Sequence, residues 1–185
     1  MTGWIIGGVV VLVIIILIGW VISTYNRLVS TRELVENAMG QISTQIESRW
    51  DALKSMIDGT KRYEKHEAEV LEGITEKRSQ IGKGAEVSDV NQDDQLFNQA
   101  LGRLIAVAEN YPDLKASTVY QDTLRNIDKY ENQVRQSRMI YNDTVTKYNR
   151  IIQMVPSNII AGMFNFTKRD YFEGTQEKTE MPSWG

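Results

Sequence analysis

Few side chains of this chain could carry out catalysis or bind a transition metal. The sequence has one histidine, His66, and no cysteine, which excludes histidine pairs, zinc–thiolate sites and thiol nucleophiles. Ser48 and Ser55 precede His66 on the same predicted helix, mostly beyond hydrogen-bonding distance of its ring, which argues against a serine–histidine–aspartate triad. No glycine-rich phosphate loop follows a strand, since no strand is evident. We therefore expect no catalytic residues.

Acidic side chains are the remaining candidates for chemistry, because carboxylates alone can bind a hard cation. They occur in a stretch of helical periodicity, where such charges typically form a solvated face with salt bridges. We therefore expect no metal site and no cofactor. The residues concerned are Glu33, Glu36, Glu64, Glu67, Glu69, Glu72 and Glu76.

The charged residues are confined to one part of the chain. Its 185 residues include 24 acidic and 21 basic side chains, a net charge of −3, and this slight acidity argues against a nucleic-acid partner. None of these charges lies in residues 1–26. The sequence therefore indicates an N-terminal segment in lipid, followed by one modest domain in water.

The first 24 residues are predicted to form a transmembrane anchor. The apolar run that follows Trp4 and ends at residue 22 would span about 27 Å as a helix, close to the ~30 Å hydrocarbon core of a bilayer. Trp4, Trp20 and Tyr25 bracket this run as interfacial aromatic residues do. The alternative is a cleaved signal peptide, which would have a basic start, a shorter apolar run and a small-residue cleavage site.

The basic residues nearest the anchor favour one orientation. No lysine or arginine precedes the apolar run, whereas Arg27 and Arg32 follow it closely. Positively charged flanks are retained on the cytoplasmic side of a membrane. We therefore predict a single-pass protein with its N-terminus outside and the rest of the chain in the cytoplasm.

Residues 25–155 are predicted to form an all-α, antiparallel up-and-down bundle of three to four helices. The first stretch has no proline, so it can form one long helix or fold back near Asp51. Residues 82–94 are rich in glycine and polar side chains and are predicted to be a mobile connection. The apolar positions of the first stretch recur at steps of three, four or their sums, and they are Leu28, Val35, Ile42, Ile46, Leu53, Ile57, Val70, Ile74 and Ile81.

Two further helices are predicted beyond this connection. The second has an apolar face over residues 96–108 and ends before Pro112, because the residue preceding a proline leaves helical space. The third begins at a cap, Ser117 or Thr118, and ends at Pro156. Periodicity leaves open whether the two helices are nearly collinear or reverse direction. The apolar stripe of the third helix is Leu124, Ile127, Val134, Tyr141, Val145, Tyr148, Ile152 and Val155.

Residues 156–173 are unusually apolar, and two interpretations of them remain open. They can dock against the bundle, or they can contact a neighbouring subunit or the membrane surface. Gly3 and Gly7 lie within the predicted anchor. They have the spacing at which two membrane helices approach closely. With these glycines, the candidates for self-association are Ile159, Ile160, Met163, Phe164, Phe166, Tyr171 and Phe172. Residues 174–185 are polar and predicted to be disordered.

Two arginines lie close to the predicted apolar stripes. Arg49 falls between Ile46 and Leu53, and Arg138 falls in the third helix. Their stems can extend along the edge of the bundle and leave the charges in water. Alternatively, the two residues form interhelical ion pairs that determine the register of the helices.

A series of short motifs occurs in a defined order along the chain. The motifs are YNRLV at 25–29, YEKHE at 63–67, AENYPDLKA at 108–116, YND at 141–143 with YN at 148–149, and AGMF at 161–164 after Pro156. In this order they resemble the LemA family of bacteria over residues 4–173, and AENYPDLKA is the most specific of them. Where the family usually has the proline-containing DLIPNL, this chain has DALKSM at 51–56, so no proline kink is implied there.

The resemblance implies a helical bundle anchored in the bacterial cytoplasmic membrane, with no established enzymatic activity. Family members are similar to a protein of magnetosome membranes and often occur alongside a membrane metalloprotease, which implies a role in organising or servicing membranes. We predict a structural or interaction protein that binds the lipid bilayer and forms a homo-oligomer or scaffold, without catalysis. The alternative is an adaptor or regulator of a membrane protease or its substrates.

Overall fold

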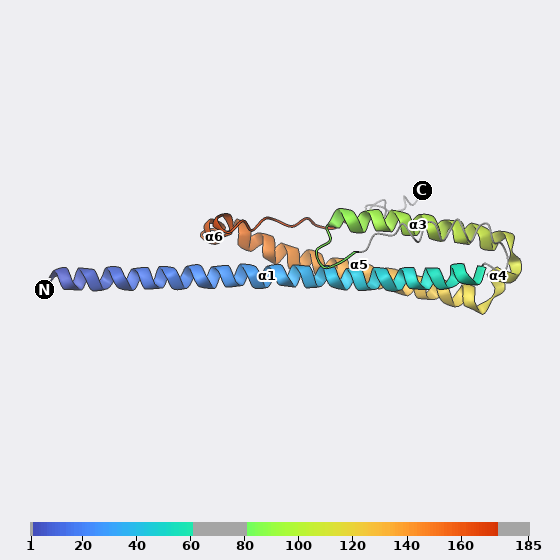
Figure 1. Ribbon diagram of the computed structural model, residues 1–185, viewed down its shortest axis with the longest axis horizontal. Helices are drawn as coiled ribbons and strands as arrows, with labels where there is room; N and C mark the ends of the chain where they lie inside the picture. Colours follow the sequence, from blue (N-terminus) through green and yellow to red (C-terminus); the bar gives the residue numbers. More distant parts are fainter. Residues whose placement is uncertain (1, 61–80, 174–185) are drawn as a thin grey trace, which may run out of the picture.

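A long helix and its antiparallel partner dominate the computed structural model, which describes residues 2–60 and 81–173 (Figure 1). In chain order the helices are α1 (Thr2–Thr60), α3 (Val87–Asn110), α4 (Pro112–Ala116), α5 (Thr118–Gln153) and α6 (Ser157–Met163). No strand occurs within the described ranges, so the predicted all-α fold is confirmed.

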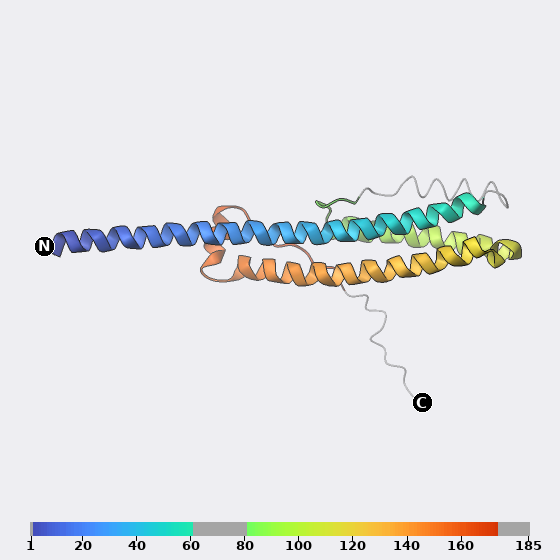
Figure 2. The ribbon, with the colours of Figure 1, turned by 90° about the horizontal axis from the view of Figure 1, so that it is seen from below.

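α1 continues without a break from its apolar start into the bundle (Figure 2). Its 59 residues correspond to a length of about 88 Å. The first part is long and apolar enough to cross a membrane, and residues 2–19 are all exposed. Because the helix passes through Asp51, the chain does not fold back there. The predicted continuation toward residue 81 falls on residues 61–80, outside the described residues.

The bundle forms beside the second half of α1. α5 runs antiparallel to α1, and α3 runs in the same direction as α1, with the short α4 at the far end (Figures 1 and 2). The chain therefore reverses between α3 and α5, and these two helices are not collinear. Ser117 caps α5 as predicted, because its hydroxyl accepts a hydrogen bond from the backbone N–H of Tyr120 at 3.2 Å.

The core follows the predicted stripes in most places. On α1 the described part of the stripe is buried up to Ile57, and Met39, Trp50 and Met56 are buried with it. Val155, assigned from its spacing to the stripe of α5, is instead exposed, because the helix ends before it at Gln153. The other two helices contribute Val90, Phe97, Ala100, Leu104, Ile127, Val134, Tyr141, Val145 and Tyr148 to this core.

The prediction of a loop over residues 82–94 is wrong from Val87 onward, where α3 begins. The first turn is capped by Asp89, whose carboxylate accepts a hydrogen bond from the backbone N–H of Glu86 at 2.8 Å. Val87 and Val90 are buried, but the next inward position carries Asp93, which is 0% exposed. This buried carboxylate interrupts the apolar pattern, and the start of the helix therefore resembled a polar loop.

After a turn at residues 164–165, residues 166–173 run back along the bundle without regular secondary structure (Figure 1). Two asparagines of α5 hold their backbone. The side-chain amide of Asn149 donates to the carbonyl of Arg169 at 2.8 Å, and its oxygen accepts from the N–H of Arg169 at 2.9 Å. Asn142 makes the same pair of bonds with Phe172, at 2.8 and 2.9 Å. The C-terminal segment is thus docked on the bundle.

Candidate functional site

The end of the bundle nearest the apolar part of α1 carries exposed apolar side chains. α6 lies beside α1 at this end (Figure 1), and the rings of Phe164 and Tyr25 are 4.8 Å apart between centroids. We call the exposed apolar surface here the apolar tip. It consists of Met154, Val155, Ile159, Met163 and Phe164, each about half exposed or more.

The residues near the C-terminus that were predicted for self-association divide into two groups. Three of them are buried in the chain's own core, and these are Ile160, Phe166 and Phe172. Contacts between copies through these three would require the C-terminal segment to leave the bundle. Four remain exposed, and these are Ile159, Met163, Phe164 and Tyr171. Gly3 and Gly7 lie on the exposed apolar part of α1.

The aromatic residues predicted to bracket the anchor have different surroundings. Trp4 and Gly7 lie on the exposed apolar start of α1. Trp20 is partly buried and packs against the core, and Tyr25 contacts the rings of Phe164 and Phe166. The bundle therefore begins where the apolar run of α1 ends.

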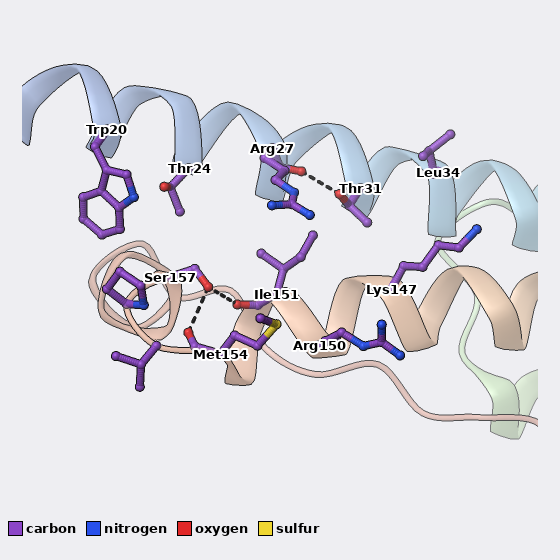
Figure 3. Close-up of a pocket in the computed structure, with 12 residues that line it drawn as sticks. Trp20, Thr24, Arg27, Thr31, Leu34, Lys147, Arg150, Ile151, Met154 and Ser157 are labelled. Carbon is purple, nitrogen blue, oxygen red and sulfur yellow. Dashed lines mark hydrogen bonds between the residues drawn. The ribbon is translucent and has the colours of Figure 1, made fainter. Parts of the chain in front are cut away.

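A pocket of about 470 Å³ opens at this junction, between α1 and the corner formed by α5 and α6 (Figure 3). Its basic side chains are Arg27, Lys147 and Arg150, and no acidic side chain lines it. Figure 3 shows Arg27 extending from α1 toward α5 and Lys147 extending from α5 toward α1. None of the three forms an ion pair with any residue in the described part of the chain.

The rest of the pocket wall is mainly apolar. It includes Trp20, Leu34, Ile151, Met154 and Val155. The corner is held by the hydroxyl of Ser157, which lies 2.6 Å from the carbonyl oxygen of Ile151 and 2.9 Å from that of Met154. The pocket thus combines positive charge with an apolar wall.

A second polar arrangement, a buried charge cluster, joins the three long helices. Arg49 is 2% exposed, and its Nη1 lies 2.6 Å from Glu131 Oε1 on α5. Its Nη2 lies 3.1 Å from both Asp93 Oδ2 and Asp94 Oδ1 on α3. The indole N–H of Trp50 donates to both carboxylate oxygens of Asp93 at 3.0 Å. Burial raises the pKa of Asp93, although the Trp50 hydrogen bond and the Arg49 charge both lower it.

Arg138 extends this cluster toward the C-terminal segment. Its Nη2 lies 2.5 Å from Asp94 Oδ2, and its guanidinium carbon lies 5.0 Å from the ring centroid of Phe172. The guanidinium of Arg49 similarly stacks 4.0 Å from the ring of Phe97. Both arginines therefore bridge helices, while their role in the register of the helices stays a prediction.

The serines considered as candidates for catalysis lie on α1, with no arrangement around them that resembles a catalytic site in the described residues. The hydroxyl of Ser48 donates to the backbone carbonyl of Thr44 at 3.0 Å, and Ser55 is exposed. Within the described residues no group of three histidine, aspartate or glutamate side chains could hold a metal ion. His66 and the acidic residues from Glu64 to Glu76 lie outside the described residues.

The partners of the two arginines were not predicted from the sequence. Positions 28, 35, 42, 49 and 56 of α1 are seven residues apart, and the fourth of them is Arg49 while the others are buried and apolar. A charged residue at such a core position must meet opposite charge on the facing helices. This spacing is the signal that could have indicated a buried cluster, although it does not identify Asp93 and Glu131.

One family model and several curated relatives match this chain. Residues 38–184 match the model of the LemA family. Magnetosome protein MamQ 2 of Paramagnetospirillum magneticum is 22% identical over 189 residues, which cover 88% of this chain and 70% of that protein. Protein LemA of Metamycoplasma hominis is 27% identical over 153 residues, which cover 82% of this chain and 69% of that protein. None of these names denotes an enzyme.

Proposed function

The chain belongs to the LemA family, and on that premise we propose that it is a membrane-anchored protein without catalytic activity whose copies associate side by side at the bacterial cytoplasmic membrane. The observation that carries this proposal is the apolar tip. It lies where the apolar run of α1 ends, and its side chains stay uncovered after the C-terminal segment has docked. Contiguous exposed apolar surface is typical of interaction sites.

Anchoring in a bilayer favours association of this kind. Copies held in one plane have a high effective concentration, so weak lateral contacts are sufficient for assembly. The family membership and the relatives named as magnetosome proteins support a membrane-associated role.

The oligomeric state tests self-association through the apolar tip. We expect the full chain, extracted in mild detergent, to be an oligomer by size exclusion with light scattering, and Ile159→Ser/Met163→Ser to shift it to monomer. These two side chains are 58% and 69% exposed, so their replacement should leave the fold intact. Val119→Ser/Met139→Ser, on similarly exposed residues of α5, is the matched control and should stay oligomeric. A monomeric wild type at micromolar concentration contradicts the proposal.

Capture after cross-linking distinguishes a scaffold from the adaptor alternative. A scaffold should recover mainly further copies of this chain. An adaptor for a membrane protease should instead recover that protease as a stable heteromer, and this result would replace the first proposal.

We also propose that the N-terminus lies outside and the bundle in the cytoplasm, since Arg27 and Arg32 follow the apolar run. The chain has no cysteine, so a single Asn126→Cys substitution at an exposed site of α5 supplies a unique label. A membrane-impermeant thiol reagent should label this variant only after the cells are permeabilised. Labelling in intact cells would reverse the assigned orientation.

A further inference from the structure

We propose that the pocket at the junction of α1, α5 and α6 binds the headgroup of an anionic phospholipid from the adjacent leaflet. This inference rests on the proposed anchoring of α1 in the membrane. It adds to that proposal a defined site and the chemical class of its ligand.

The charge of the pocket favours an anion, and its three basic residues are exposed and open to a ligand from outside. Arg27, Lys147 and Arg150 bring three positive charges to one cavity that has no acidic lining residue. A phosphate group offers oxygen acceptors to which guanidinium and ammonium groups donate strong, charge-assisted hydrogen bonds.

The end of the pocket nearest Trp20 lies at the depth of lipid headgroups. Trp20, which lines the pocket, is also the aromatic residue near the end of the apolar run. Arg27 follows it by seven residues, or about 10 Å along the helix. The headgroup layer of a bilayer begins at the edge of the hydrocarbon core and is about 5–8 Å deep, and an arginine side chain can extend back toward it.

The apolar wall favours a phospholipid over a free phosphate ion. Ile151, Met154 and Val155 give the cavity a surface that a small, strongly hydrated ion would not use. The part of an acyl chain nearest the headgroup would cover this surface. The rest of the chain would continue along the exposed apolar residues of α1 that precede Trp20. A phosphate group and its attached hydrocarbon therefore match the two halves of the pocket.

Native mass spectrometry of the full chain tests the site. The delipidated protein in detergent is equilibrated with equal amounts of phosphatidylglycerol and phosphatidylcholine that have identical acyl chains, and the retained lipid is identified. We expect a preference for phosphatidylglycerol of at least about tenfold, because each basic side chain near a charged headgroup contributes severalfold to binding. Arg27→Gln/Lys147→Gln/Arg150→Gln should reduce this preference to near one.

A matched variant controls for net charge. Arg103→Gln/Lys115→Gln/Arg135→Gln removes three exposed basic groups outside the pocket, and it should keep the wild-type preference. An equal loss in both variants, or no preference in the wild type, would overturn the lipid site. Complete displacement of phosphatidylglycerol by inorganic phosphate would overturn it in favour of a site for the free ion.

Flotation with vesicles of phosphatidylcholine alone separates this inference from the proposed function. The wild type and both variants should float, because the anchor does not depend on the pocket. If the wild type does not float, the proposed membrane anchoring is wrong, and the lipid site that depends on it is wrong as well. If it floats but shows no preference for phosphatidylglycerol, the lipid site alone is wrong.

Discussion

Replacing Arg49 with leucine should lower the free energy of unfolding by about 3–5 kcal/mol, the usual cost of removing one partner from a buried ion pair. The substitution leaves Asp93, which is 0% exposed, without its main positive partner. Asp94 and Glu131 also lose a guanidinium contact. Urea unfolding of the full chain in detergent, followed by far-ultraviolet circular dichroism, measures the loss.

The same substitution should make stability depend on pH in a defined direction. Burial already raises the pKa of Asp93, and loss of the neighbouring positive charge raises it further. A carboxyl whose pKa is higher in the folded protein than in the unfolded chain favours folding when protonated, and this contribution is lost as the pH rises through the folded pKa. The loss in free energy of unfolding caused by Arg49→Leu should therefore be smaller at acidic than at neutral pH.

Two further variants control this first prediction. Arg49→Leu/Asp93→Asn removes both charges but keeps an oxygen that can accept the hydrogen bond from Trp50, so it should recover a large part of the lost stability. Arg103→Leu removes an exposed arginine from the same bundle and should change stability by no more than about 0.5 kcal/mol. A cost below about 1 kcal/mol for Arg49→Leu would show that the cluster is effectively solvated.

The C-terminal segment should be released by Asn142→Asp/Asn149→Asp. Each aspartate keeps an acceptor but loses the donor that bonds to the carbonyl of Phe172 or Arg169, and it places a negative charge against that carbonyl. Each substitution should weaken the docking of the segment by about 1–3 kcal/mol. Even the smaller value at both sites raises the fraction of molecules with an undocked segment more than tenfold. Trypsin should then cut after Lys168 and Arg169 at least about tenfold faster, as measured by intact-mass spectrometry.

Asn126→Asp is the matched control for this second prediction. It makes the same chemical change on the exposed surface of α5, and it should leave the rate of cleavage after Lys168 and Arg169 unchanged. Equal rates for the double variant and the wild type would mean that burial of Phe166 and Phe172 holds the segment without the asparagines.

Periodicity predicted the helices wherever their inward positions are apolar. The described stripe of α1 and the helix α5, with its Ser117 cap, were predicted correctly in this way. Helix periodicity and helix capping both depend only on residues a few positions apart in the chain. The start of α3 was missed because Asp93 occupies a core position that only Arg49 and Trp50 make favourable.

The docking of the C-terminal segment could not be predicted from the local sequence pattern either, because it depends on residues far apart in the chain. Asn142 and Asn149 bond to residues 30 and 20 positions away in the chain, and a side-chain amide that pairs with distant backbone leaves no periodic signature. The burial of Phe166 and Phe172 depends on the same long-range contact. The pocket likewise needed the fold, because Arg27 and Lys147 are brought together only by the pairing of α1 with α5.

The unbroken course of α1 connects its apolar start to the bundle through a single continuous helix. Membrane helices commonly tilt by about 20° to match the thickness of the bilayer. The helix extends from residue 22 to Thr60, or about 57 Å beyond the apolar run, so such a tilt swings its far end sideways by roughly 20 Å. With the proposed anchor in the bilayer, a local thinning or thickening of the membrane would therefore displace the opposite end of the protein laterally by a similar distance.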